Sequence, residues 1–391
     1  MLHLLRLHYG KIVFIIYIAV LIYGYLTPKI TLKRIYYTDT AAMLTSGVII
    51  NSGKKDLLYE PAEQFKAYGS LVQENVTSHP ISLPFRNPPF VAYFFVILAP
   101  LGLLTAYKIF FVLNIILLHI TVYLLSKNSH LSQNLKLTLF SSFLLPTTMY
   151  AILLGQLSII ILFLLTLAYI TLINQKDFQS GIITSLLLIK PQYFIIWPFL
   201  YIMCTNKKSF ILGTLFTICA LGALSLTIVP VNTLLNYPRI ILEANIKDST
   251  NPNIISYTYF GLIDQLIKPT PITAPIALLT NFMFYTVSLW LFKSIKGAVP
   301  LNIKMSLAII LTIIFSIHSL MYDLTLLFLP ATLLILKETK TRRNKSIYFY
   351  CCFLILVMVI TYFKQIPASL TTSVVVGGLL ITTTNLLTKK Y

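Results

Sequence analysis

The chain has 391 residues, of which 57% are hydrophobic and 10% are charged. Apolar runs of about 15 to 22 residues recur along it, which excludes a soluble globular protein and predicts a polytopic, all-α membrane protein. The formal net charge of +19 does not indicate a nucleic-acid partner, because the basic residues stand at the ends of apolar runs. That placement is typical of proteins oriented in a lipid bilayer.

The first apolar run, residues 12–26, follows Arg6 and Lys11 and has no small-residue cleavage site after it, so it predicts an uncleaved anchor. The longest polar interval comes next, at residues 28–89, and holds five of the eleven acidic residues. Asp39 lies shortly after the anchor, close to the predicted membrane surface, where a carboxylate can act as a general base. A solvated loop acid is the alternative interpretation.

We predict about twelve spans and a long first outer loop. The spans cover residues 11–28, 105–126, 137–154, 156–174, 178–190, 192–205, 209–230, 272–292, 302–320, 323–337, 346–363 and 367–387. Residues 88–104 form a further apolar run, but Pro88-Pro89 and Pro100-Leu101-Gly102 interrupt it. We expect this run to lie on the membrane surface, or to enter and return.

The basic residues orient this arrangement. With twelve spans both termini are cytoplasmic, and the inner segments carry 17 Lys and Arg against two acids, whereas the outer segments carry 13 against nine. The asymmetry follows the positive-inside rule. We therefore predict one integral domain over residues 1–391, in the plasma membrane, with its active site facing outward.

Polar residues at the span ends gather on the predicted outer side. They are Asp39, Arg86, Asn87, Gln156, Lys190, Gln192, His318 and Asp323, together with the loop at residues 231–257. Ionisable groups are costly at membrane depth, so several at one face indicate a functional site. Plainer interpretations stay open: Lys190 could snorkel to the surface, His318 could bond a backbone carbonyl, and Gln156 could cap a helix.

The four cysteines all fall in apolar runs, and the chain contains neither a phosphate-binding glycine loop nor a zinc pattern. We therefore expect no disulfide, no metal site and no cofactor.

The order of the polar motifs resembles that of the polyprenol-phosphate-mannose-dependent alpha-mannosyltransferases of the GT-C class. The resemblance covers about residues 1–335. The motifs are Asp39 after the first span, Pro84-Phe85-Arg86-Asn87-Pro88-Pro89-Phe90, Gly155-Gln156, Lys190-Pro191-Gln192, and His318 followed by Tyr322-Asp323. The resemblance implies a GT-C fold, a sugar donor on a polyprenyl-phosphate carrier, and a catalytic base in the first outer loop, for which Asp39 is the matching position.

The chemistry of such a transfer fits these residues. A lipid-linked sugar phosphate already carries a good leaving group, so the enzyme needs a base for the acceptor hydroxyl and cations for the departing phosphate. We expect Asp39 to be the base, Arg86, Lys190 and His318 to bind the donor phosphate, and Asn87, Gln156, Gln192 and Asp323 to bind substrate. The predicted function is transfer of a hexose, with mannose as the first candidate, to a lipid or glycan acceptor with inversion. A lipid or solute transporter and a non-catalytic subunit of a glycan-assembly complex are the alternatives.

Overall fold

The structure is a computed structural model, and it describes residues 19, 35–72, 83–128, 146–249, 256–267, 273–294 and 299–335. Every regular element in these residues is a helix, which confirms the all-α class. The predicted spans at 346–363 and 367–387, nearly all of 11–28 and the first part of 137–154 lie outside the described residues.

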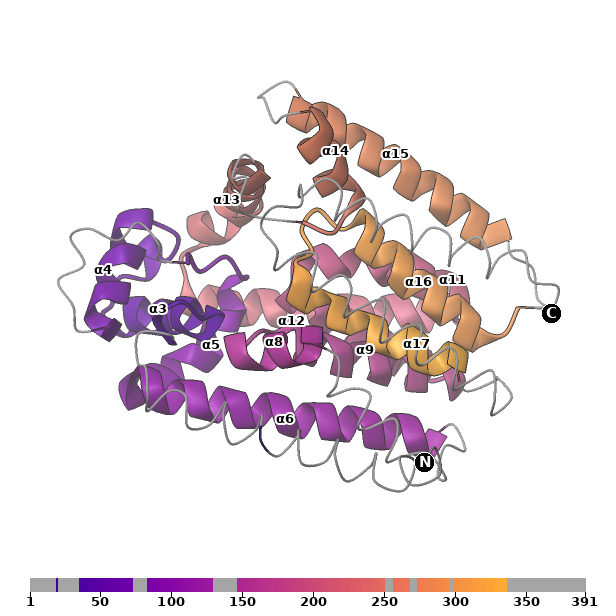
Figure 1. The fold of residues 1–391 in the computed structure, drawn as a ribbon, viewed down its shortest axis with the longest axis horizontal. Coiled ribbons are helices and arrows are strands. Elements are labelled where there is room, and N and C mark those ends of the chain that lie inside the picture. Colours follow the sequence, from indigo (N-terminus) through magenta and orange to yellow (C-terminus); the bar gives the residue numbers. More distant parts are fainter. Residues whose placement is uncertain are drawn as a thin grey trace, which may run out of the picture.

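The helices follow one another in three groups (Figure 1). The first comprises α3 (Asp39–Asn51), η1 (Lys55–Leu57), α4 (Pro61–Val72), α5 (Pro89–Leu98), η2 (Ala99–Leu101) and α6 (Gly102–Asn128). The second comprises α8 (Pro146–Leu154), α9 (Ser158–Ile173), α10 (Asp177–Leu186), η4 (Leu187–Ile189), η5 (Pro191–Ile196), α11 (Trp197–Met203) and α12 (Lys207–Ile228). The third comprises α13 (Val231–Ser249), α14 (Tyr259–Ile267), α15 (Thr273–Ser294), α16 (Leu301–Phe315), η6 (Met321–Leu327) and α17 (Phe328–Ile335).

Three segments among the described residues are long and apolar enough to cross a membrane. They are Pro89–Lys127, Lys207–Ile228 and Pro275–Ser294. A fourth candidate is the pair Thr147–Leu154 and Ser158–Ile173, which is bent by 118° at the break between its two helices. The described part of the chain therefore has three or four candidate spans, and the total of twelve stays a prediction.

Two polar intervals that we predicted as loops are largely helical where the structure describes them. Residues 28–89 contain α3 and α4, and residues 231–257 contain α13. Most residues of α3 are small or apolar and buried, and α3 packs closely on α5 and α4. Because α3 mixes Ala, Thr, Ser and Gly with its apolar residues, hydropathy alone does not predict that this helix is buried.

The apolar run at residues 88–104 breaks where predicted. Helix α5 begins at Pro89, and η2 ends just before Gly102, whose φ of 75° lies in the left-handed region that favours glycine. The ten residues of α5 rise only about 15 Å, half the apolar thickness of a bilayer. Alone, α5 is too short to span, whereas the whole segment Pro89–Lys127 has the length and composition of a span.

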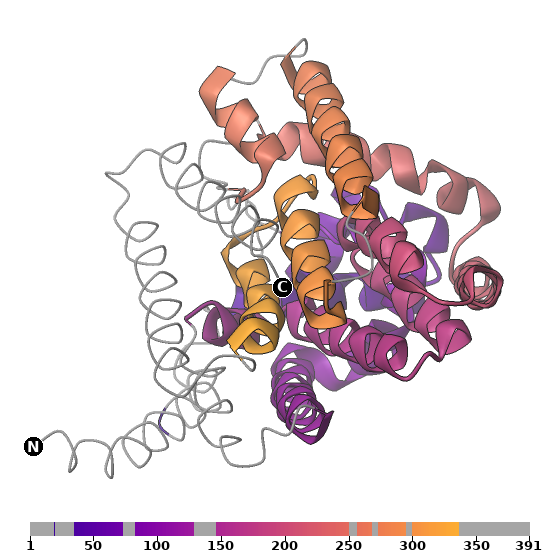
Figure 2. The ribbon, with the colours of Figure 1, turned by 90° about the vertical axis from the view of Figure 1, so that its right-hand side faces the viewer.

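Helix α9 lies at the centre of the bundle. It packs against α6, α8, α10, α16, α17 and η6, and side chains on all its faces are buried, as expected for a helix that is apolar all round. Helix α10 crosses α12 closely, since a Cβ on Gly181 would overlap the Phe210 carbonyl and one on Gly213 that of Phe178. In both views α13, α14 and α15 lie on one side and α6 on the other (Figures 1 and 2).

Candidate active site

Asp39 is the first residue of α3. Its place in the first helical turn suits a carboxylate, because the helix dipole is positive there. The side chain is partly buried rather than solvated. Burial raises the pKa of the Asp39 carboxyl to about 6, while the positive charge of Lys190 and the neighbouring Gln156 amide act to lower it. Asp39 is therefore ionised at neutral pH and can accept a proton.

The turn between α8 and α9 packs directly on the start of α3. Gly155 in this turn has a φ of 63°, and a Cβ at that position would overlap the Thr40 hydroxyl. Gln156 is buried beside Asp39, and its Nε2 makes no hydrogen bond of ordinary geometry within the described residues, although the amide lies close enough to lower the pKa of the Asp39 carboxyl. A buried amide donor beside a carboxylate suits a substrate hydroxyl.

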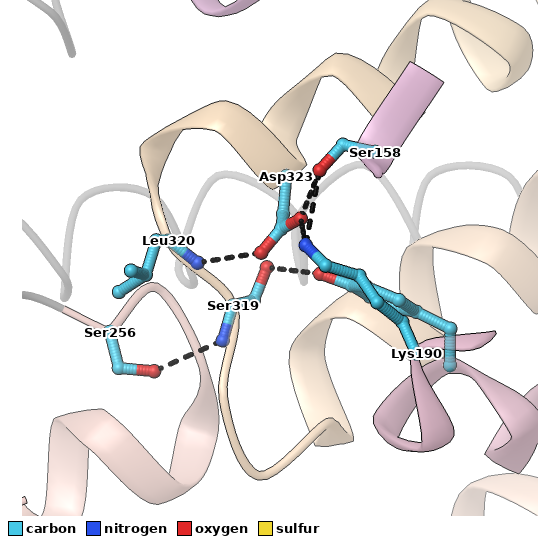
Figure 3. Close-up of polar contacts among 7 residues, drawn as sticks. Ser158, Lys190, Ser256, Ser319, Leu320 and Asp323 are labelled. Carbon is cyan, nitrogen blue, oxygen red and sulfur yellow. Dashed lines mark hydrogen bonds and ion pairs between the residues drawn. The ribbon is translucent and has the colours of Figure 1, made fainter. Parts of the chain in front are cut away.

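A buried ion pair adjoins the same turn (Figure 3). Lys190 Nζ lies 2.7 Å from Asp323 Oδ1, and the two side chains are 9% and 1% exposed. The Ser158 hydroxyl donates to the same carboxylate oxygen at 2.5 Å and accepts from Lys190 at 3.2 Å. The backbone N–H of Leu320 donates to Asp323 Oδ2 at 3.1 Å. The snorkelling alternative for Lys190 is therefore wrong.

The local chain path explains why Lys190 points inward. Lys190, between two 3₁₀ segments, has a non-helical backbone with φ −126° and ψ 89°, because Pro191 follows it and disfavours a helical conformation at the residue before it. Its ammonium lies 4.9 Å from the Tyr322 ring centre and 5.9 Å from that of Tyr193, so two aromatic faces enclose the charge. The Tyr150 ring in turn lies 6.3 Å from that of Tyr322.

A chain of hydrogen bonds extends from this cluster toward His318. The Tyr193 hydroxyl donates to the Ser319 hydroxyl at 3.2 Å. The Ser319 N–H donates to the Ser256 hydroxyl at 3.3 Å (Figure 3). The Tyr257 N–H donates to the Ser319 carbonyl at 2.7 Å. His318 is half-buried beside Ser319, between α16 and η6. These contacts fix the backbone that carries His318.

Arg86 and Asn87 are fixed through their backbone, in the segment before α5. The Tyr237 hydroxyl of α13 donates to the Arg86 carbonyl at 3.1 Å, and the Tyr59 hydroxyl donates to the Asn87 carbonyl at 2.8 Å. Both side chains are half-buried, as is that of Gln192 in η5. The structure thus joins Asp39, Gln156, Lys190 and Asp323 in one cluster, while Arg86 and Asn87 are held by contacts from α13 and the segment before α4.

The sequence analysis missed several residues of the cluster, namely Thr40, Tyr150, Ser158 and Tyr193. The spacing in the sequence could have indicated two of them. Ser158 follows Gln156 by two residues, and Tyr193 follows Lys190 by three, which is one helical turn. The described residues contain no group of three or more His, Cys, Asp or Glu side chains that could hold a metal ion.

A partly buried carboxylate, a buried lysine and a buried amide, in described residues that form only helices and include apolar candidate spans, are compatible with the GT-C class of polytopic membrane glycosyltransferases. The model of glycosyltransferase family 87, which is in that class, matches residues 85–330, more than half of the chain. The chain belongs to this family and is a glycosyltransferase. No curated protein and no solved structure matches it. Asp39 precedes the matched residues, and the fold brings it to Gln156 and Lys190, which lie within them.

Proposed function

We propose that the chain transfers a hexose, with mannose as the first candidate, from a polyprenyl-phosphate carrier to an acceptor hydroxyl. The single observation that carries this proposal is the position of Asp39, a partly buried carboxylate acted on by the charges of Lys190 and Asp323. A base that is ionised at neutral pH suits an acceptor hydroxyl, and a lysine nearby suits an anionic leaving group.

The reaction is a direct displacement. Asp39 takes the proton of the acceptor hydroxyl, whose oxygen bonds to C1 of the sugar while the bond from C1 to the phosphate oxygen breaks. Polyprenyl phosphate leaves with the electron pair, and the anomeric centre inverts. Arg86, Lys190 and His318 are the proposed phosphate ligands, and Asn87, Gln156 and Gln192 the proposed substrate contacts.

We further propose that the site faces outward from the plasma membrane and that both termini are cytoplasmic. Helix α12 supports this orientation. Its first residues are Lys207 and Lys208, and Lys55 donates to the carbonyl of Thr227 near its other end at 3.3 Å. Twenty-two residues rise about 33 Å, so the two ends lie a bilayer apart. The segment between α3 and α4 then lies opposite the basic loop before α12.

A transfer assay tests the proposal. The purified protein is incubated with labelled polyprenyl-phosphate mannose or glucose and a membrane lipid extract, and labelled products are separated by mass. We expect a new glycosylated product with an inverted anomeric centre. Glu60→Gln is the control for substitutions of Asp39, because Glu60 is an exposed acid in the same interval, residues 28–89. Movement of the labelled lipid between leaflets without any product would contradict transfer and favour a transporter.

A further inference from the structure

The ion pair between Lys190 and Asp323 indicates a role for Asp323 other than the substrate binding that we predicted. We propose that Asp323 is a positioning residue: with Ser158 it holds the Lys190 ammonium beside Asp39, where the opposed charges of the pair set the protonation of the general base. The inference rests on the proposed function, since it concerns the base of that reaction.

The geometry leaves little of Asp323 for a substrate. Its Oδ1 accepts from Lys190 at 2.7 Å and from Ser158 at 2.5 Å, and its Oδ2 accepts from the Leu320 N–H at 3.1 Å. The side chain is 1% exposed. A carboxylate with both oxygens engaged, buried almost completely, contacts a substrate poorly, but it fixes the ammonium that it binds.

The turn from Gly155 to Ser158 connects the pair to the base. Gly155 packs on Thr40, the residue after Asp39, and Gln156 lies beside the Asp39 carboxyl. Ser158, at the other end of the same turn, bonds both members of the ion pair. One turn therefore contacts both the start of α3, which carries Asp39, and the ion pair that holds the Lys190 ammonium.

The two charges of the pair act on Asp39 in opposite directions. Lys190 lowers the pKa of the Asp39 carboxyl and Asp323 raises it, both of them weaker effects than burial, which raises it. Tyr150 and Tyr322 also lie close, but phenols are uncharged at neutral pH. The other elements packed on α3, with the residue before η1, carry Lys54, Lys55, Asp56, Glu63, Lys66, Lys108, His119 and Lys127, of which Lys54 and Glu63 pair with each other at 2.5 Å.

Because Lys190 and Asp323 change the pKa of Asp39 in opposite directions, removing each charge should give opposite shifts. Structural damage alone would not produce shifts of opposite sign. The acidic limb of the pH profile of kcat should move to lower pH in Asp323→Asn, because Lys190 then acts alone, and to higher pH in Lys190→Met. Ser158→Ala changes no charge and should leave the limb in place while lowering kcat. Shifts of both charge variants in the same direction, or no shift in either, would overturn the proposal.

Removing one partner of a buried pair can unfold a protein, so a variant without both charges is included. Lys190→Met with Asp323→Leu replaces the pair by apolar side chains, which proteins often tolerate. Since the two charges oppose each other, its limb should lie between those of the single variants. A limb outside that interval contradicts the proposal, and so does a double variant that shifts as far as Lys190→Met alone.

A second readout requires no activity. Hydrophobic carbodiimides react with protonated carboxyls, so the yield of modified Asp39, measured by mass spectrometry against pH, follows its protonation. We expect carbodiimide modification of Asp39 to persist to higher pH in Lys190→Met than in the wild-type protein. In Asp323→Asn it should stop at lower pH than in the wild-type protein. If the transfer assay gives no product but these shifts appear, the proposed function fails while the charge coupling holds. If product forms but the shifts are absent, the proposed function holds and the charge coupling fails.

Discussion

Gly155 lies against Thr40 so closely that residue 155 has no room for a side chain. Its φ of 63° also favours glycine. We predict that Gly155→Ala lowers the free energy of unfolding in detergent by more than the about 1–3 kcal/mol that a strained backbone alone costs. Transfer activity should fall with it, because the displaced turn carries Gln156 and Ser158.

Gly53 supplies the matched control for this variant. Its φ is 79°, and a Cβ there meets nothing within 4 Å. Gly53→Ala should therefore show the backbone strain without the overlap, and Thr40→Ala should restore part of the stability lost in Gly155→Ala. Equal losses in the two glycine variants would show that the contact with Thr40 is not important.

Asp177 connects the start of α10 to the start of α12. Its Oδ2 accepts from the Thr205 hydroxyl and from the Asn206 N–H, both at 2.6 Å. Burial acts to raise the pKa of the Asp177 carboxyl, but these hydrogen bonds outweigh it and lower the pKa below its ordinary value. We predict that Asp177→Asn lowers the free energy of unfolding at pH 7 by about 1–3 kcal/mol.

The pH dependence of this effect has a definite sign. A carboxyl with a lowered pKa in the folded state stabilises the fold fully above its unfolded pKa, at about 4, and loses that contribution as the pH falls through the folded value. The difference between Asp177→Asn and the unmodified sequence should therefore shrink below about pH 4. Unfolding midpoints from about pH 3 to about pH 7 check this, with Glu243→Gln, in an exposed pair with Arg239, as a neutral control.

Membrane orientation gives a further prediction. In a variant without the native cysteines, Ser52→Cys should react with an impermeant maleimide on intact cells, since Ser52 is exposed just after α3. Lys208→Cys, at the basic end of α12, should react only after the membrane is permeabilised. Labelling of the Lys208 position in intact cells, with the Ser52 position protected, would contradict the proposed topology and indicate the opposite orientation.

The sequence predicted the helical class and the break at Gly102, because apolar runs and glycine or proline act locally. It also indicated Asp39, Gln156, Lys190 and Asp323 as members of one site. It could not predict that Lys190 and Asp323, 133 residues apart, pair with each other, since pairing depends on packing between distant helices. The helices α3 and α13 were missed because their mixed polar and apolar residues show no long apolar run.

The transfer rate of Asp39→Asn tests the central claim most directly. The substitution keeps the shape of the side chain and removes its ability to accept a proton, and general-base catalysis typically contributes about 10²- to 10⁴-fold. Since the pKa of Asp39 is raised to about 6, transfer by the unmodified sequence should also fall as the pH drops below that value.

With labelled polyprenyl-phosphate sugar at saturating concentration, we predict that Asp39→Asn folds and binds the donor but transfers at least about 100-fold more slowly. Glu60→Gln should transfer at the normal rate. Near-normal transfer by Asp39→Asn would contradict the assignment of Asp39 as the base.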